Sequence, residues 1–319
     1  MLSHEDYTVG WVCALPLEMT AAKAMLDETH SNLSQPATDH NAYTLGKISA
    51  HNVVITCLPS GVYGTTPATA VVSKMSSTFP RIQFGLMVRI GGGVPGNGAD
   101  IRLGDVVISK PTGSYSGVVQ YDRGKAISGG RFKLSGTLNQ PPQLLLTSIA
   151  QLEADQMSGK DHSIAKIMSE TQEQIHAVKA IFACPGQEQD QLFHSTYDHK
   201  ESEDTCVNCD KQQLVHREQR ASKGPEIHYG LIASGNQVMK DGQTRDNLAR
   251  EHGIICFEME AAGLMNQLPC LVIRGICDYS DSHKNKIWQG YAALTAASYG
   301  KMLLSVVPVA FPPSKKTGM

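Results

Sequence analysis

The sequence has no long hydrophobic run, no excess of charge of one sign and no internal repeat. No apolar stretch approaches the roughly 20 residues that a membrane-spanning helix needs, so we expect no membrane partner. The formal net charge is −2, which argues against a nucleic-acid partner. Residues 1–6 lack the basic and apolar regions of a secretory signal peptide, and we therefore expect a cytoplasmic protein.

The composition is typical of a globular protein with a sizeable core, since 41% of the 319 residues are hydrophobic and 18% are charged. Strand-like and helix-like patterns alternate, which favours a largely parallel sheet with helices on both faces. We therefore predict one α/β domain over residues 1–319, built as a three-layer α/β/α sandwich around a mixed, largely parallel sheet. Strands are expected at residues 8–14, 53–58, 84–90, 106–108, 227–233, 255–257 and 270–273, and helices at 16–25, 68–75, 170–182, 246–252, 258–267 and 288–307.

Two regions depart from this alternation. Residues 183–225 are polar and have too little apolar content for a core of their own, which indicates an insertion loop. Residues 308–319 are expected to form a loose tail.

The insertion contains residue types that bind zinc. Cys206 and Cys209 form a Cys-x-x-Cys pair, with His194, His199 and His216 nearby. A lone pair of this kind is a weak signal, and loop thiols or a disulfide are the alternatives. A zinc ion here would be structural, and we expect no catalytic metal.

The most informative segment is Arg274–Asp281, which follows the apolar run Cys270–Ile273. It puts two carboxylates at the C-terminal end of a strand, where open α/β sheets build ligand sites. Upstream, the segment Phe257–Ala262 contains two glutamates and is expected to open a helix. This arrangement suggests a site that holds a ribose and protonates a base.

Four ordered motifs resemble the purine nucleoside phosphorylase and nucleosidase superfamily, and within it a fungal branch whose domains occur alone or fused to NTPase and repeat modules. Each is weak alone, and together they extend from Tyr7 to about Val307 apart from the insertion. The resemblance implies a nucleoside phosphorylase-like fold, no cofactor, a purine nucleoside as the small-molecule partner, and a homo-oligomer, a dimer or higher. The motifs are Ala14–Glu18, Arg89–Gly93 with Gly104-Asp105, Phe257–Glu260 and Arg274–Asp278.

Asp278 is the candidate general acid. Cleavage of an N-glycosidic bond passes through an oxocarbenium-like sugar, and the resemblance implies that Asp278 serves N7 of the departing purine. A general acid works best with a pKa near the working pH, and we expect partial burial to raise the pKa of Asp278 toward it. The alternative is an Asp that caps the next helix.

Glu260 is the candidate ribose anchor, because a carboxylate can accept hydrogen bonds from both vicinal hydroxyls. Met259 is expected to lie against the apolar face of the sugar. Of Glu258 and Glu260, only Glu260 is expected to face the site. The alternative is that both acids simply favour the positive N-terminus of a helix.

Glu18 distinguishes hydrolysis from phosphorolysis. Phosphorylases of the superfamily usually have Gly-Asp-Pro-x-Arg at this position, whereas this chain has Ala-Leu-Pro-Leu-Glu. A carboxylate repels phosphate but can take a proton from water, and the resemblance implies this catalytic role for Glu18. The alternative is a first-turn Glu stabilised by the helix dipole.

Arg89 favours phosphorolysis or a nucleotide substrate. The resemblance implies that Arg89 contacts inorganic phosphate or the phosphate of a nucleotide such as ATP. The alternative is an Arg paired with an acid. Gly92 and Gly93, with Gly91, are expected to let the backbone approach the sugar or an anion, or else to form a turn. Val238 and Met239 are expected to line the purine.

The leading hypothesis is a purine nucleosidase that releases free base and ribose from purine ribonucleosides. The alternatives are a phosphorylase that uses inorganic phosphate and a nucleosidase that acts on nucleotides. A third, from another class, is a module that binds purine ligands without turnover.

Overall fold

The computed structural model describes residues 2–96, 98–128, 131–160, 163–174, 179–200, 205–220, 222 and 224–309. Its strands are β1 (Val9–Cys13), β2 (Glu28–Thr29), β3 (Tyr43–Ile48), β4 (His51–Cys57), β5 (Phe84–Gly93), β6 (Val106–Ser109), β7 (Val118–Gln120), β8 (Gly124–Ile127), β9 (Arg131–Leu134), β10 (Ile227–Ser234), β11 (Ile254–Glu258) and β12 (Cys270–Asp278). Its α-helices are α1 (Pro16–Ala24), α2 (Thr65–Thr78), α3 (Gln143–Met157), α4 (Ile164–Gln174), α5 (Gly242–His252), α6 (Ala261–Leu264) and α7 (Gln289–Val306). Within the described ranges, none of these helices combines the length and hydrophobicity of a membrane span.

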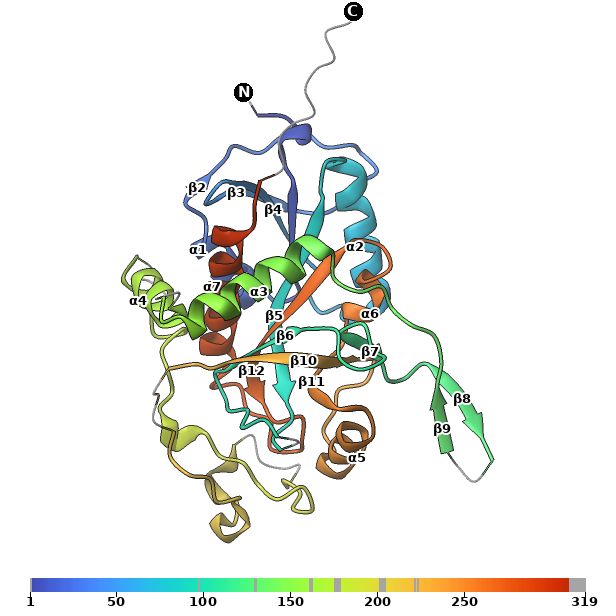
Figure 1. The fold of residues 1–319 in the computed structure, drawn as a ribbon, viewed down its shortest axis with the longest axis vertical. Coiled ribbons are helices and arrows are strands. Elements are labelled where there is room, and N and C mark those ends of the chain that lie inside the picture. The colour runs from blue at the N-terminus through green and yellow to red at the C-terminus, as the bar shows by residue number, and fades with distance from the viewer. Residues whose placement is uncertain are drawn as a thin grey trace, which may run out of the picture.

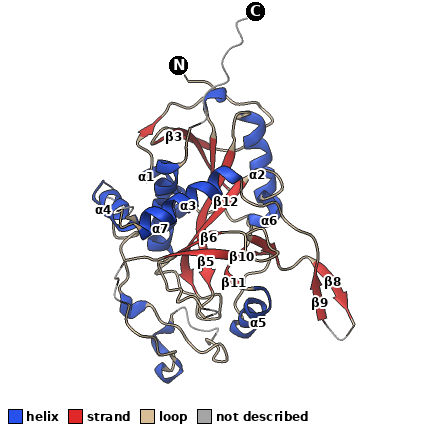
Figure 2. Cartoon of the chain, viewed as in Figure 1, coloured by secondary structure: helices blue, strands red, loops and turns tan. Residues whose placement is uncertain are grey.

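The predicted layers are confirmed (Figures 1 and 2). Helices α1, α3, α4 and α7 share one hydrophobic core with residues such as Trp11 of β1. Helices α2 and α6 share the second core with Val12 of the same strand. Because neighbouring strand residues point to opposite faces, the consecutive apolar residues of β1 fill both cores. The sequence of β1 is therefore a continuous apolar run, which is typical of a strand in a sheet that is covered on both faces.

The main sheet has the strand order β11-β10-β6-β12-β5-β1-β4-β3-β2, with β7 beside β10. Strand β5 is parallel to both β1 and β12. Antiparallel pairs join β12 to β6, β5 to β11, β3 to β4 and β2 to β3, so the sheet is mixed. Because β11 pairs with both β10 and β5, the strands β5, β12, β6, β10 and β11 close into a ring. The ring brings the ends of β5, β11 and β12 together.

The three glycines at the end of β5 belong to the strand, so the alternative of a turn after residue 90 is wrong. Gly91 pairs with Ile276 of β12, and Gly92 pairs with Asp278. Gly93 lies where an added Cβ would be 2.8 Å from Ile276 and 2.9 Å from Ile101. These glycines therefore allow β5 and β12 to continue side by side as far as Asp278.

The helix expected at 258–267 is shorter than predicted, because Glu258 ends β11 and α6 begins at Ala261. The carboxylate of Glu258 accepts hydrogen bonds from the amides of Glu260 and Ala261. This side chain therefore satisfies the amides at which the helix begins.

Some elements were missed in the polar middle of the chain. Helix α3 was not predicted, although its buried residues Leu145, Ile149 and Leu152 join the core of α1 and α7. The helix expected at 170–182 begins earlier, as α4, and residues 179–182 form a turn, so its predicted C-terminal end is wrong. Residues 175–178 lie outside the described residues, whereas Phe182 is buried in the core. The polar outer faces of α3 and α4 obscured an apolar stripe in each helix.

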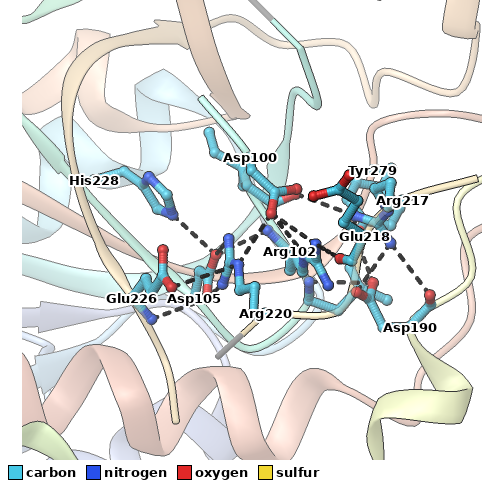
Figure 3. A network of polar contacts seen from close by, with 12 residues as sticks. Asp100, Arg102, Asp105, Asp190, Arg217, Glu218, Arg220, Glu226, His228 and Tyr279 are labelled. Atoms are coloured by element: carbon cyan, nitrogen blue, oxygen red, sulfur yellow. Dashed lines mark hydrogen bonds and ion pairs between the residues drawn. The ribbon is translucent and has the colours of Figure 1, made fainter. Parts of the chain in front are cut away.

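The segment 183–225 is joined to the sheet by the ion pair of Arg220 and by a hydrogen bond of Arg217 (Figure 3). Its described residues form three short 3-10 helices, Gln187–Gln189, Cys206–Asn208 and Lys211–Gln213. Arg220 donates to both carboxylate oxygens of Asp105 at 2.8 Å. Arg217 donates to Asp190 at 2.9 Å and to the hydroxyl of Tyr279 at 2.8 Å. Burial raises the pKa of Asp105, but hydrogen bonds from His228 and Arg220 outweigh it, and the pKa is lowered.

The single-domain organisation and the insertion remain predictions. Of the predicted tail, residues 310–319 lie outside the described residues.

Candidate active site

Arg89 lies between two of the predicted site carboxylates. Its Nε donates to Glu18 Oε2 at 3.3 Å, and its Nη1 lies 2.5 Å from Glu260 Oε2. The three residues are buried, with exposures of 6%, 3% and 3% for Arg89, Glu18 and Glu260. Tertiary contact therefore brings together residues that are more than 240 positions apart in the chain.

Glu18 lies in the first turn of α1, which begins at Pro16. Its Oε2 accepts hydrogen bonds from the amides of Ala14 at 2.7 Å and Leu15 at 3.0 Å. Its Oε1 accepts one hydrogen bond, from the amide of Ile90 at 3.0 Å. The alternative interpretation of Glu18 is a glutamate that stabilises the N-terminus of a helix. Its contacts with the amides of Ala14 and Leu15 agree with that interpretation. Because each carboxylate oxygen has two lone pairs, Oε1 keeps acceptor capacity.

Glu260 precedes α6 and contacts the start of α2 as well as Arg89. Its Oε1 accepts a hydrogen bond from the amide of Gly64 at 3.2 Å. Gly64 has φ of 104°, and an added Cβ would lie 2.9 Å from Asn236 Oδ1. A side chain at this position would be strained. Gly64 was not predicted as a site residue, although the sequence marks a turn there.

Glu258 has a different partner from Glu260. Its Oε2 lies 2.5 Å from Nη2 of Arg274, which is fully buried. Burial raises the pKa of Glu258, but the guanidinium of Arg274 outweighs it and the pKa is lowered. Arg274 also donates to the carbonyl of Met87 at 2.7 Å. The contacts of Arg274 therefore connect β11, β12 and β5.

Arg89 remains a cation. Burial lowers its pKa, but the charges of Glu18, Glu260 and Glu258 outweigh burial and raise it. The alternative interpretation of Arg89, an arginine paired with an acid, therefore describes its contacts in this structure.

Asp278 is the last residue of β12 and pairs with Gly92. Its Oδ1 accepts hydrogen bonds from Lys284 Nζ at 2.6 Å and from the amide of Ser280 at 2.8 Å. Burial raises the pKa of Asp278, but the ammonium group of Lys284 outweighs it and the pKa is lowered. Our expectation of a raised pKa is therefore wrong, because it considered burial without the cation.

Two further residues of this loop escaped the sequence analysis. Lys284 stands six positions after Asp278, and that spacing alone was the available signal. Ser280 is fully buried with φ of 54°, and its hydroxyl has no hydrogen-bond partner among the described residues. A Cβ at Gly92 would overlap Ser280 Oγ and lie 2.6 Å from Asp278 Oδ1. Gly92 therefore provides the space into which this loop folds.

A cavity of about 300 Å³ adjoins Asp278. Its lining includes Tyr279, Asp281 and His283 of the same loop and Cys206 of the segment 183–225. Glu18 and Glu260 do not line it. Asp281 contacts Arg245 of α5 at 3.4 Å and so joins the loop to that helix.

The predicted purine-lining residues lie in different environments. Val238 is 53% exposed. Met239 packs against the hydrophobic cluster that includes Tyr121 and Phe257. Their role toward a purine remains a prediction.

Of the candidate zinc ligands, the structure brings three together. His199, Cys206 and Cys209 have ligand atoms within 4.8 Å of one another. His194 and His216 are not in this group.

Comparisons with known proteins identify a matching family and several relatives. A family model described as "Phosphorylase superfamily" matches residues 8–299. A nucleotide-binding leucine-rich repeat (NLR)-like protein of Hyaloscypha variabilis is 49% identical over 316 residues, covering 98% of this chain and 31% of that protein. A 5′-methylthioadenosine/S-adenosylhomocysteine nucleosidase of Mycobacterium bovis is 31% identical over 90 residues, covering 27% of this chain and 35% of that protein. The chain thus spans about a third of the length of these curated relatives.

Solved structures share the fold. A futalosine hydrolase of Helicobacter pylori matches with a TM-score of 0.56 at 16% identity, covering 95% of this chain and 99% of that one. A 5′-methylthioadenosine/S-adenosylhomocysteine nucleosidase of S. pneumoniae, solved with a transition-state inhibitor, matches with a TM-score of 0.57 at 16% identity. That match covers 94% of this chain and 100% of that one. At such identities the similarity concerns the fold.

Proposed function

The chain belongs to the phosphorylase superfamily, and on that premise we propose that it is a purine nucleosidase, which hydrolyses purine ribonucleosides to free base and ribose. The observation that supports hydrolysis most directly is the position of Arg89. Its guanidinium contacts the carboxylates of Glu18 and Glu260, so its charge is already balanced by groups of the protein.

The charge balance of the cluster disfavours phosphorolysis. The carboxylates of Glu18, Glu258 and Glu260 face the guanidiniums of Arg89 and Arg274, so three negative charges stand against two positive ones. A phosphate anion would meet an excess of negative charge in a buried site, where Coulomb repulsion is poorly screened. Neutral water meets no such barrier.

Glu18 is the proposed general base. Its Oε2 accepts two backbone hydrogen bonds and one from Arg89, whereas Oε1 accepts one from the amide of Ile90. A water molecule bound at Oε1 would transfer a proton to the carboxylate as its oxygen attacks the anomeric carbon. The backbone amides hold the carboxylate in one orientation before the reaction.

Glu260 is the proposed anchor of the ribose hydroxyls. Its Oε1 accepts one hydrogen bond, from Gly64, and keeps capacity for a hydroxyl donor. Since Arg89 contacts both Glu260 and Glu18, it would hold the sugar-binding carboxylate and the general base in fixed relation. Positioning of this kind supplies a large part of catalysis.

Asp278 is the proposed proton donor to the base. Its Oδ1 is held by Lys284 and Ser280, whereas Oδ2 contacts only the thiol of Cys277 at 3.4 Å among the contacts described. A purine nitrogen placed at Oδ2 would bring a lone pair against the carboxylate and favour its protonation. That proton, taken from solvent, would then pass to the base as the glycosidic bond breaks.

The test is base release from adenosine, guanosine, inosine and ATP, with and without inorganic phosphate. We expect free ribose at the same rate in both conditions. The Glu18→Gln variant should lose roughly 100-fold or more in kcat, whereas Glu28→Gln, at an exposed glutamate, should behave as the wild type.

Three results would contradict the proposal. Ribose 1-phosphate formed only with phosphate would indicate a phosphorylase. Full activity in Glu18→Gln would remove the proposed base. Tight binding of purine ligands without base release would indicate a binding module.

A further inference from the structure

We propose that His199, Cys206 and Cys209 bind one zinc ion, which fastens the segment 183–225 to the loop 278–284 that carries Asp278. The site is separate from the carboxylate cluster and does not depend on the proposed function. It gives a role to three residues that take no part in the proposed hydrolysis.

The donor types of the three residues fit zinc, and a water molecule would take the fourth position of the tetrahedral ion. Two thiolates and one imidazole are soft and borderline donors, which favour zinc over calcium or magnesium. Their ligand atoms lie within 4.8 Å of one another. Two sulfurs that bind one tetrahedral zinc ion at about 2.3 Å are about 3.8 Å apart, so small side-chain rotations close the site.

The hydrogen bond of His199 leaves one of its ring nitrogens available to a metal. Its Nε2 lies 3.1 Å from the carbonyl oxygen of Thr205. Because a carbonyl only accepts hydrogen bonds, Nε2 must carry the proton, and the lone pair is then on Nδ1. Metal-binding histidines commonly donate their second N–H to a carbonyl in this way.

The cluster is attached to the loop that follows β12. The amide of His199 donates to Ser282 Oγ at 2.9 Å, a contact that is independent of the metal. Cys206 Sγ lies 3.7 Å from the carbonyl oxygen of His283, and zinc would displace the thiol proton while Cys206 stays beside the loop. The ring of His283 stacks on Phe193 with centroids 4.1 Å apart. Ser282 and His283 lie between Asp278 and Lys284, so an ion at the cluster would restrain the loop that holds both.

The described part of the segment has little regular structure of its own. Its described residues form only 3-10 helices and one isolated bridge, between Phe193 and Leu214. A segment with a small core gains stability from a metal, because the binding free energy adds to the folding free energy. The zinc ion would complement the ion pair between Arg220 and Asp105 and the hydrogen bond from Arg217 to Tyr279.

The first test is the metal content of the purified chain, prepared without chelators. We expect about one zinc ion per chain, lost in Cys206→Ser, Cys209→Ser and His199→Gln. The matched controls Cys184→Ser and His194→Gln change an exposed cysteine and an exposed histidine outside the cluster, and should keep the zinc ion. Replacement by Co²⁺ should give thiolate-to-cobalt charge-transfer bands that weaken in Cys209→Ser.

The second test addresses the fastening, and it keeps the proposal testable if a variant fails to fold. Zinc is removed from the wild type by mild chelation, and hydrogen exchange is measured before and after zinc is restored. We expect faster exchange in residues 183–225 and in residues 278–284, reversed by zinc. Faster exchange in the first segment alone would overturn the fastening.

The zinc site itself would be overturned by a chain that neither contains nor binds zinc, by zinc retained in both cysteine variants, or by an intact mass that shows a Cys206–Cys209 disulfide. None of these results concerns nucleoside hydrolysis, so failure of the zinc site and failure of the proposed function are distinguishable.

Discussion

The ammonium group of Lys284 lies 2.6 Å from Oδ1 of Asp278, the carboxylate proposed to protonate the leaving base. Both side chains are partly buried, with exposures of 25% for Lys284 and 13% for Asp278. Burial alone would raise the pKa of the carboxyl, but the cation holds that pKa below the ordinary value. The acidity of Asp278 is therefore tuned by a neighbour in the same loop.

Replacing Lys284 with Gln should shift the pH profile of base release. A required acid with a lowered pKa makes kcat/KM fall as pH rises above that pKa. Without the ammonium group, burial raises the pKa of Asp278, so this limb should move to higher pH by roughly one unit or more. The measurement is kcat/KM against pH.

Lys286→Gln is the control, since this exposed lysine stands two positions further on, and its profile should match that of the wild type. An unmoved profile in Lys284→Gln would show that the cation does not tune Asp278.

Glu260→Gln should weaken the recognition of ribose hydroxyls. The wild type should strongly prefer adenosine to 3′-deoxyadenosine, because the deoxy analogue leaves a buried acceptor without a donor. In the variant we expect kcat/KM for adenosine to fall roughly 100-fold and the preference for adenosine to shrink. The control is Glu251→Gln, at an exposed glutamate of α5. An unchanged ratio of the two substrates would contradict the assignment.

Arg274→Met should destabilise the fold, because it leaves the buried Glu258 without its cation. Loss of one partner of a buried ion pair costs about 3–5 kcal/mol. The double variant Glu258→Gln with Arg274→Met should recover part of this loss, since no charge is then left unpaired. Urea unfolding of the three proteins measures the difference. A single variant as stable as the wild type would contradict the buried pair.

The same pair gives a pH dependence with a definite sign. In the wild type the pKa of Glu258 is lowered from 4.5, so its contribution to stability is present above about pH 4.5 and is lost as pH falls through the folded-state pKa. In Arg274→Met, burial without the cation should raise that pKa, and stability should be lost as pH rises through it. The difference in unfolding free energy between the two proteins should therefore increase from acid to neutral pH.

Gly92→Ala should reduce activity more than stability. The new Cβ would overlap Ser280 Oγ and lie 2.6 Å from Asp278 Oδ1, which displaces the proposed acid. We expect kcat to fall roughly 10- to 100-fold, as for a misplaced catalytic group. At Gly224 a Cβ meets nothing closer than 3.8 Å, so Gly224→Ala is the matched control. Normal turnover in Gly92→Ala would show that the loop adapts.

Local patterns in the sequence were sufficient for the core elements. Apolar runs predicted β1, β5 and β12, and Pro16 predicted the start of α1, because these signals depend on neighbouring residues. The motifs also identified Glu18, Arg89 and Glu260, which the fold brings into contact. The polar surfaces of α3 and α4 gave weaker signals, and the boundaries of α6 depended on the side chain of Glu258.

The sequence by itself thus determined the alternating architecture, the superfamily and the carboxylates of the candidate site, since residue types, order and spacing are enough for these. Only the tertiary structure decided which charges meet. Lys284 lowers the pKa of Asp278, Arg89 is shared between Glu18 and Glu260, and His199 joins Cys206 and Cys209. The physical reason is that the ionisation and reactivity of a buried group depend on neighbours within a few ångströms, and the fold chooses those neighbours from distant parts of the chain.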